Sequence, residues 1–365
     1  MKVLHVGKFY PPHKGGMEIH LKQLVAYQAK LIDVDAIVAN DGPRTHSERL
    51  DGGLITRVAS FGTLASMPLT PALNWHLHKH PADIIHLHTP NPGGALAILS
   101  SPRSRKLVIT HHSDTLGRPL LSGLARPFVQ AAMKSASAII VTSMTYRDTS
   151  IELAPYRDKC VVIPLGIDPR RFSRVEPEMV AKIHSSFGAR IVLSVGRLVP
   201  YKGFEYLIHA MSDVNAVLLL VGDGPLKGSL QALIRETGMK EKVFLLDKIE
   251  DSLLPSFYQA ASTFVMPSIN RAEAFGIVQL EAMASGLPVI NTSIPSGASE
   301  VSIHNQTGLT VAPCDPQALS DGINMLLEDH DLRARFGLAA KTRFYKEFTA
   351  KQMATRTIDL YRRLL

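Results

Sequence analysis

Short apolar runs rich in valine and isoleucine alternate with segments of helical period from one end of the chain to the other. Runs of this length, bounded by glycine, proline and polar residues, are typical of strands buried on both faces. The strands expected in the first half are residues 2–7, 35–40, 54–60, 83–89, 106–112, 138–143 and 160–167. The pattern then restarts with residues 190–196, 216–224, 242–248, 263–268, 287–293 and 307–313.

Helical segments such as residues 16–30, 225–238 and 256–262 fill the gaps between many of these strands. Because strand and helix alternate, each series predicts a parallel sheet with helices on both faces. Two such series predict an α/β chain with two Rossmann-like, doubly wound domains.

The boundary between the two series is expected after residue 168, where DPRRFSRVEPE supplies a charged, proline-bearing linker. This boundary gives a first domain over residues 1–168 and a second domain over residues 169–348. Residues 349–365 place Met353, Thr357 and Leu360 near one side of a helical projection. That pattern predicts an amphipathic helix that packs back on the first domain.

Composition limits the compartment and the class of protein. A chain of 365 residues with 45% hydrophobic content can bury two cores. Cys160 and Cys314 lie far apart without a CxxC spacing, which indicates neither a disulfide framework nor a cysteine zinc site and favours the reducing cytoplasm. The apolar run before Lys8 is too short for a signal peptide, and no later run is long enough to span a membrane. We therefore expect a cytoplasmic protein, soluble or peripheral at the inner face of the membrane.

The formal net charge is +8, and residues 1–168 hold 18 Lys and Arg against 12 Asp and Glu. The first domain is therefore the expected contact for an acidic partner such as a phospholipid surface or a phosphorylated acceptor. No signature of a nucleic-acid-binding module accompanies the charge, so nucleic acid is not expected as a partner. Residues 117–137 carry Arg118, Arg126 and Lys134 among apolar residues. This pattern is typical both of a helix on an anionic membrane and of a core helix with snorkelling cations.

A glycine-bearing loop follows the first strand of each of the two series. Doubly wound folds bind phosphates at such loops. In KFYPPHKGGME, Gly15 and Gly16 stand at the entry to a helix, where the missing Cβ would let a phosphate approach the backbone. In VGRLVPYKGF, Arg197 and Lys202 lie five positions apart and could neutralise a diphosphate. A tight turn and a solvated basic loop are the alternatives.

The stretch RAEAFGIVQLEAM places Glu273 and Glu281 eight positions apart. Glu273 is expected to project from a loop, and the following helix is expected to start at residue 275 and to end at Gly286. Glu281 would then lie about 12 Å further along the helix axis, which suits a ligand with a sugar and a ribose at the two ends of a diphosphate. Alternatively, Glu273 favours the helix dipole and Glu281 lies at the surface. The N–H groups expected at the start of the helix are those of Phe275, Gly276 and Ile277.

Residues 267–290 resemble the E-x7-E signature of the retaining nucleotide-sugar glycosyltransferases of family 4. The resemblance covers essentially the whole chain, because KFYPPHKGGME, PLGID, VGRLVPYKGF, VGDGPL and TGLTV are each similar to a segment of that family in the same order. It implies the GT-B fold, in which two Rossmann-like domains face a central cleft. It also implies transfer of a sugar without a metal or other cofactor.

The resemblance gives each site residue a role. Glu273 would contact the hydroxyls of the donor sugar, and Glu281 would accept hydrogen bonds from the ribose. Arg197 and Lys202 would hold the diphosphate and stabilise negative charge on the leaving group. The donor site would be completed by Gly15, Gly16, Ala274, Phe275, Gly276 and Ile277.

Histidines are frequent in the first half of the chain. In VITHHSDT the active-site histidine of the family matches His112, with His111 as the competing assignment. His86 and His88 would share one face of a strand, a feasible spacing for metal ligands, but no carboxylate or cysteine cluster completes the set. No metal site is therefore expected. The run HLHKH at residues 76–80 is expected to be the end of a surface helix.

The expected reaction moves a hexose from a nucleotide sugar to a glycan or lipid-linked glycan. The combination of motifs is most similar to bacterial mannosyl- and rhamnosyltransferases of surface-polysaccharide assembly, which implies GDP-mannose or GDP-rhamnose as donor. A UDP-sugar-dependent retaining transferase and a nucleotide-sugar 2-epimerase remain the alternatives. A dinucleotide-dependent oxidoreductase is not expected, because neither VGKFYPP nor VGRLVPY has the GxGxxG turn.

Overall fold

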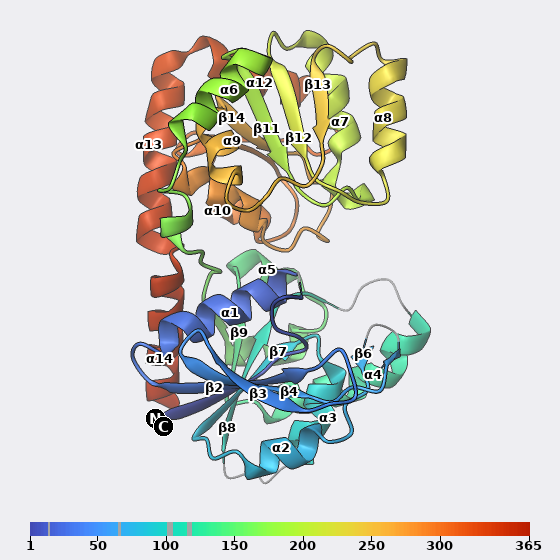
Figure 1. Ribbon diagram of the computed structural model, residues 1–365, viewed down its shortest axis with the longest axis vertical. Helices are drawn as coiled ribbons and strands as arrows, with labels where there is room; N and C mark the ends of the chain where they lie inside the picture. The colour runs from blue at the N-terminus through green and yellow to red at the C-terminus, as the bar shows by residue number, and fades with distance from the viewer. Residues whose placement is uncertain (14, 65–66, 101–104, 115–118) are drawn as a thin grey trace. The chain divides into compact units, whose positions relative to one another are not determined.

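The computed structural model describes residues 1–13, 15–64, 67–100, 105–114 and 119–365. The chain divides into two compact units. Unit 1 comprises Met1–Gly166 and Ala350–Leu365, and unit 2 comprises Ile167–Thr349 (Figure 1). Among the described residues, no helix is both long enough and apolar enough to cross a membrane.

Unit 1 is built on an eight-stranded sheet in the order β10-β9-β8-β7-β1-β2-β4-β3, in which only the β3–β4 pair is antiparallel. The strands are β1 (Lys2–Val6), β2 (Asp33–Ala39), β3 (His46–Leu50), β4 (Gly53–Val58), β7 (Ile84–Thr89), β8 (Lys106–His111), β9 (Ala138–Val141) and β10 (Cys160–Val162). A separate small ribbon pairs β5 (Thr63–Leu64) with β6 (Met67–Pro68). The parallel sheet expected from the apolar runs is therefore confirmed for this half of the chain.

Helices cover both faces of this sheet. On one face, α1 (Gly16–Gln28) and α14 (Ala350–Leu364) pack leucine, methionine and tyrosine side chains against Val3 and Val34. On the other face, α2 (Leu73–Lys79), α3 (Pro92–Leu99) and α4 (Pro119–Ser135) pack against Leu4 and Val6. The short helix α5 (Met144–Thr149) follows β9. The C-terminal helix thus belongs to the core of unit 1, although it lies about 180 residues beyond the rest of that unit.

Two details of unit 1 differ from the expected strands. The run expected as a strand over residues 160–167 ends at Val162. Ile163 still donates a backbone hydrogen bond to Val141, but Pro164 has no N–H with which to continue the ladder. The pattern also missed β3, whose sequence HSERL is polar and mostly exposed because it forms the edge of the sheet.

Unit 2 is a six-stranded, all-parallel sheet in the order β13-β12-β11-β14-β15-β16. The strands, each within its expected range, are β11 (Ile191–Val195), β12 (Val217–Val221), β13 (Val243–Leu246), β14 (Thr263–Met266), β15 (Val289–Thr292) and β16 (Gly308–Val311). The helices are α6 (Pro177–Phe187), α7 (Phe204–Ala210), α8 (Lys227–Glu236), α9 (Leu254–Ala260), α10 (Ile277–Ala284), α11 (Ala298–Val301), α12 (Pro316–Glu328) and α13 (His330–Glu347). The chain fills one half of this sheet outward from β11 and then returns to fill the other half from β14. This is the Rossmann strand order, and ligands bind such sheets where the order reverses.

Candidate functional site

The strand order of unit 2 reverses between β11 and β14, which are neighbours in the sheet. The loop after β11 carries Arg197 and Lys202, and the loop after β14 carries Glu273. A backbone hydrogen bond from Ile269 to Tyr201, 2.9 Å long, joins the two loops. The fold therefore brings three of the expected site residues to the point where a doubly wound sheet binds its ligand.

Lys202 and Glu273 form an ion pair between Nζ and Oε2. The two residues are only 7% and 8% exposed, and Ser268 donates a further hydrogen bond of 3.2 Å to the same carboxylate oxygen. Glu273 lies in the loop after β14, as expected, but it is paired and buried. Its carboxylate is held in place, with a buried ammonium group beside it.

Gly203 explains why the lysine of this pair can lie so close to the next strand. It adopts a left-handed conformation with φ of 65°, and a Cβ atom there would lie 2.3 Å from the carbonyl oxygen of Pro267. A side chain would force the two loops apart. Arg197 differs from Lys202 because it is exposed. The loop thus presents one fixed and one solvent-facing cation.

Helix α10 begins at Ile277 and not at Phe275, so the expected start of this helix was wrong by two residues. Gly276 precedes it in a left-handed conformation, where a Cβ would lie 2.7 Å from Sδ of Met266 and 2.8 Å from Nε2 of Gln279. Phe275 is buried and packs edge to face on Phe348. Gln279, the third residue of the helix, donates its backbone N–H to the carbonyl of Gly276 at 2.9 Å. The N–H groups of Ile277 and Val278 come before the first carbonyl–amide bond of the helix, as an anion site requires.

Glu281 is the fifth residue of α10, about one turn into the helix instead of two. It is 9% exposed and not at the surface. Tyr258 donates a hydrogen bond of 2.9 Å to its Oε2, and Nη1 of Arg171 lies 3.8 Å from its Oε1. Burial raises the pKa of Glu281, and Arg171 and the hydrogen bond from Tyr258 oppose that rise.

The sequence patterns did not indicate that Arg171 and Tyr258 are neighbours of Glu281. Arg171 belongs to the charged linker segment, and its Nη2 also lies 3.2 Å from Asp251. It lines a cavity of about 830 Å³ together with Arg170, Arg174 and Asp251. The basic cluster in DPRRFSR was the available signal, but the 110 positions between Arg171 and Glu281 hide the contact from a local pattern.

In unit 1, Gly15 and Gly16 stand at the entry to α1. Gly15 is the residue before the helix and is extended, and Gly16 is its first residue. Among the residues that the structure describes, no atom lies within 4 Å of the position that a Cβ of Gly16 would take, whereas a Cβ of Gly15 would meet the carboxylate of Glu18. Open space at Gly16 suits the approach of a ligand to the backbone. A role in donor binding stays a prediction for both residues.

The two histidines at the end of β8 differ in environment. His111 is fully buried, and its ring nitrogens face Oγ1 of Thr89 at 2.9 Å and Oδ1 of Asp114 at 3.4 Å. His112 is half-buried, and its backbone N–H donates to the carbonyl of Thr89. Because His112 is the member of the pair with solvent access, the geometry favours its assignment over that of His111. A catalytic role for His112 stays a prediction.

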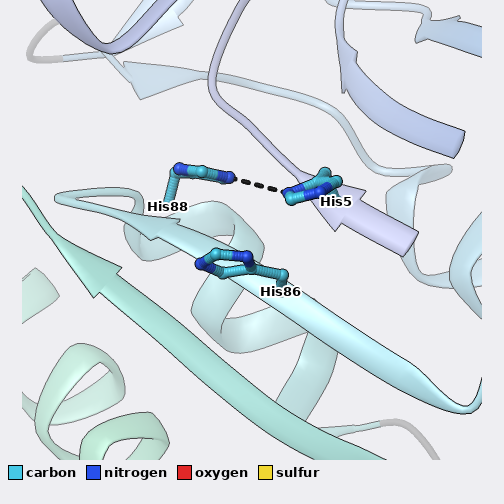
Figure 2. A group of neighbouring side chains, drawn as sticks. All are labelled: His5, His86 and His88. Carbon is cyan, nitrogen blue, oxygen red and sulfur yellow. Dashed lines mark hydrogen bonds between the residues drawn. The ribbon is translucent and has the colours of Figure 1, made fainter. Parts of the chain in front are cut away.

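A chain of hydrogen bonds continues from His112 into the core of unit 1. Nε2 of His112 lies 3.3 Å from Nδ1 of His88. Nε2 of His88 in turn lies 3.0 Å from Nδ1 of His5, as Figure 2 shows. Nε2 of His5 lies 2.7 Å from Oε1 of Gln28, whose amide nitrogen points to the hydroxyl of Tyr361.

This chain fixes the tautomers, because Oε1 of Gln28 can only accept. Burial lowers the pKa of His5 to about 4 and holds the pKa values of His88 and His112 well below the usual value, so the three rings are neutral at pH 7. Each ring must then carry its proton on Nε2. The Nδ1 lone pair of His112 is left for a ligand.

Further histidines, and not carboxylates or cysteines, surround His86 and His88. His5 and His20 contact this pair from β1 and α1, and His112 contacts it from the end of β8. His86 itself lies between the hydroxyl of Tyr361 and Oγ1 of Thr110. The run at residues 76–80 does form the C-terminal end of a helix, α2, as expected. The expectation that no metal takes part stays a prediction.

Known proteins similar to this chain were found by sequence and by structure. Residues 14–171 match the family described as Glycosyltransferase Family 4, and residues 176–343 match Glycosyl transferases group 1. The chain is 30% identical to the D-rhamnosyltransferase WbpZ of Pseudomonas aeruginosa, over 96% of this chain and 93% of that protein. It is also 30% identical to the O-antigen chain mannosyltransferase C of Escherichia coli, over 100% of this chain and 99% of the relative.

Solved structures show the same fold at lower identity. A crystal structure of Anabaena Alr3699/HepE in complex with UDP matches with a TM-score of 0.79 and 22% identity, covering 99% of both chains. Sucrose-phosphate synthase from Thermosynechococcus elongatus matches with a TM-score of 0.82 and 24% identity, covering 100% of this chain and 98% of the other. These likenesses confirm the GT-B class with its two Rossmann-like domains.

Proposed function

We propose that this chain, which belongs to glycosyltransferase family 4, transfers a hexose with retention of configuration from GDP-mannose or GDP-rhamnose to a lipid-linked glycan or polysaccharide. Membership of the family makes the chain a glycosyltransferase. The donor, the retaining course and the acceptor are the proposed part.

The buried pair of Lys202 and Glu273 at the reversal of the strand order carries this proposal. A binding site for a sugar diphosphate needs fixed positive charge for the phosphates and a fixed acceptor for sugar hydroxyls. The pair supplies both, and Arg197 adds a cation that can move onto the ligand from solvent. Preorganised charges of this kind need no rearrangement when negative charge develops on the leaving diphosphate.

The proposed reaction is a front-face displacement. The bond between the anomeric carbon and the diphosphate oxygen breaks first, which leaves an oxocarbenium-like sugar. The acceptor hydroxyl then forms the new bond on the same face and gives its proton to the departing phosphate oxygen. Arg197 and Lys202 stabilise the leaving diphosphate, and Glu273 and His112 are proposed to orient the sugar.

Glu281 is proposed to bind the ribose hydroxyls. Its carboxylate is fixed by Tyr258 and lies next to Arg171, which leaves acceptor capacity for a diol. Burial disfavours the ionised form of Glu281 because its carboxylate loses hydrating water. Hydrogen bonds from the two ribose hydroxyls would compensate for that lost hydration. The nucleoside end of the donor is therefore assigned to this part of unit 2.

The preference for a GDP donor is supported by relatives. Besides the rhamnosyl- and mannosyltransferase already described, the chain is 25% identical to a GDP-mannose-dependent phosphatidylinositol monomannoside mannosyltransferase of Mycolicibacterium smegmatis, over 93% of this chain. The UDP found in the Anabaena structure favours a UDP-sugar as the second candidate donor. A 2-epimerase is the third candidate, and it would convert the donor without any acceptor.

Contact with an anionic membrane is also proposed, because the acceptor is lipid-linked. In α4, Arg126, Phe128 and Lys134 are exposed, and basic and aromatic side chains together bind the headgroup region. Arg118, the third cation of this segment, lies outside the described residues.

A transfer assay tests the proposed function. Purified protein is incubated with α-linked GDP-mannose or GDP-rhamnose, or in parallel with α-linked UDP-sugars, each labelled in the sugar, and with glycolipids extracted from a strain that lacks this gene. We expect label in the glycolipid only when the acceptor is present, and an α linkage by NMR. A β linkage would contradict retention, transfer from UDP-sugars alone would contradict the donor, and epimerised donor without acceptor would contradict the transfer itself.

A further inference from the structure

Three histidines from three elements of unit 1 converge beside the chain of hydrogen bonds. They are His20 of α1, His88 of β7 and His112 at the end of β8, and one nitrogen of each lies within 4.8 Å of the others. Nδ1 of His88 and Nε2 of His112 are 3.3 Å apart, which is long for a hydrogen bond between nitrogens. In a tetrahedral zinc site with bonds of about 2.0–2.1 Å, two ligand nitrogens lie about 3.3–3.4 Å apart. The pair already has the spacing of two metal ligands.

Within this group, His20 is a buried histidine whose ring nitrogens have no hydrogen-bond partner among the described residues. The residue is 6% exposed. Buried polar atoms are nearly always paired, and an ion bound to one nitrogen of this ring would satisfy that nitrogen. The ring meets His112 edge-on at 4.8 Å and His88 at 5.4 Å between centroids. His20 therefore lies where a third ligand to the same ion would lie.

The surroundings of His88 are those of a metal ligand. Its Nδ1 carries the lone pair, because its Nε2–H donates to His5, which in turn donates to Gln28. Ligating histidines normally give their second N–H to such a partner, which fixes the ring and raises its basicity. Only His112 has to move its proton, from Nε2 to Nδ1, to offer a lone pair to the ion.

Two neighbouring groups fit a metal less well. His5, His86 and His88 also lie within 4.8 Å of one another (Figure 2). However, both nitrogens of His86 have partners, Tyr361 and Thr110, and both nitrogens of His5 are likewise bonded. A second group holds His111, Asp114 and Glu152. There the carboxylate of Asp114 is already an acceptor for hydroxyls of Tyr146 and Ser150.

We propose that His20, His88 and His112 form a site for a late first-row divalent cation, with Zn²⁺ as the fitting ion. Three neutral imidazoles provide the soft nitrogen ligands that such ions select. His112 is half-buried, so the fourth position opens toward solvent and takes water. The site is separate from the diphosphate-binding residues of unit 2, and its occupancy does not depend on which sugar the enzyme transfers.

Cobalt titration of the untagged, full-length protein tests this site, because tetrahedral Co²⁺ absorbs visible light strongly and octahedral Co²⁺ does not. We expect one equivalent of Co²⁺ to produce the tetrahedral spectrum and Zn²⁺ to displace it. His20→Leu should weaken Co²⁺ binding at least about 10-fold, the lower end of what even a supporting residue contributes. Since no residue in the described part of the chain bonds the ring nitrogens of His20, this variant should fold. His112→Gln, at a half-buried position, should show the same loss.

Three matched variants control for the alternatives. His78→Gln removes an exposed histidine, His86→Gln tests the His5 group, and Glu152→Gln tests the acidic group. All three should keep the affinity and the spectrum of the wild-type protein. Wild-type protein without a tetrahedral spectrum at stoichiometric Co²⁺ would overturn the proposal. Full Co²⁺ affinity in His20→Leu, or loss confined to His86→Gln or Glu152→Gln, would also overturn it.

Discussion

Lys202 and Glu273 lie 71 positions apart in the sequence and form a buried ion pair where the strand order of unit 2 reverses. Removing one member of such a pair leaves the other charge buried without compensation, which typically costs about 3–5 kcal/mol. The pair therefore has two separable properties. It contributes to the stability of unit 2, and it presents charge to the proposed donor.

Lys202→Met is expected to abolish transfer and to destabilise unit 2 by about 3–5 kcal/mol. The double variant Lys202→Met/Glu273→Gln should recover most of that stability, because no charge is left unpaired, but it should recover no activity. Denaturant unfolding and the transfer assay measure the two properties side by side. Measurable transfer by the folded double variant would remove the pair from the site.

Glu281→Gln is expected to stabilise the nucleotide-free protein at pH 7 while weakening GDP binding about 10-fold, as the loss of a charged acceptor of about 1.4 kcal/mol would. Burial raises the pKa of Glu281 above its usual value near 4.5. The folded state therefore holds this proton more tightly than the unfolded state, and stability falls as pH rises from about 4.5 through the folded pKa. A glutamine at this position does not ionise, so this loss of stability with rising pH disappears. Its side-chain oxygen can still accept the hydrogen bond from Tyr258.

Thermal unfolding at pH 4.5 and at pH 7, with and without GDP, measures both effects of Glu281→Gln. The gain in stability should appear at pH 7 and shrink toward pH 4.5. A variant that is less stable than wild type at pH 7 without nucleotide, or that binds GDP as tightly, would contradict the role given to Glu281.

Unit 1 is expected to lose stability as pH falls below 6.5. Burial lowers the pKa of His5 to about 4 and that of His20 to about 3, whereas the unfolded chain takes up these protons near pH 6.5. The unfolded state then binds more protons, so each such histidine costs about 1.4 kcal/mol per pH unit below 6.5 until its folded pKa is reached.

Hydrogen exchange resolved by peptide can follow unit 1 and unit 2 separately between pH 8 and pH 5. Peptides from β1 and β7 should lose protection as the pH falls, after correction for the intrinsic exchange rate. His20→Leu should make the dependence shallower, since it removes one of the buried rings. A free energy of opening in unit 1 that stays constant over this range would argue against neutral, buried rings at His5 and His20.

Binding to anionic vesicles is expected to depend on α4. Arg126→Glu/Lys134→Glu should reduce co-sedimentation with phosphatidylserine vesicles about 10-fold or more, since each basic residue near the surface contributes about 1 kcal/mol. Lys240→Glu, an exposed cation of unit 2, is the control and should bind like wild type. Equal binding by both variants would place any membrane contact elsewhere.

Much of the fold could be predicted because both sheets are parallel and buried. All six strands of unit 2 lie within the ranges indicated by their apolar runs, since a strand covered on both faces must be apolar throughout. The search for apolar runs missed the edge strand β3. Its sequence HSERL is polar, because most of its side chains are exposed at the edge of the sheet. The start of α10 was misplaced because Phe275 is apolar but packs on Phe348 outside the helix.

The site could be predicted as residue types but not as contacts. Motif spacing pointed to Lys202, Glu273 and Glu281, yet their partners come from distant loops, as Arg171 and Tyr258 do for Glu281. The histidine cluster depends on strand register, which pairs His5 directly with His86. Nothing in a local pattern fixes that register, so the residues that surround His88 were not foreseen.

The most direct test of the account is the thermal shift caused by nucleotides in wild type and in Arg197→Met. Arg197 is exposed, so its replacement should leave the unliganded protein stable. A ligand present at 100 times its Kd stabilises the folded state by about 2.7 kcal/mol. We predict that GDP raises the Tm of the wild-type protein more than UDP or ADP does, and that most of this rise is lost in Arg197→Met. An equal GDP shift in both proteins would contradict the proposed diphosphate site, and a wild-type response to UDP alone would contradict the proposed donor.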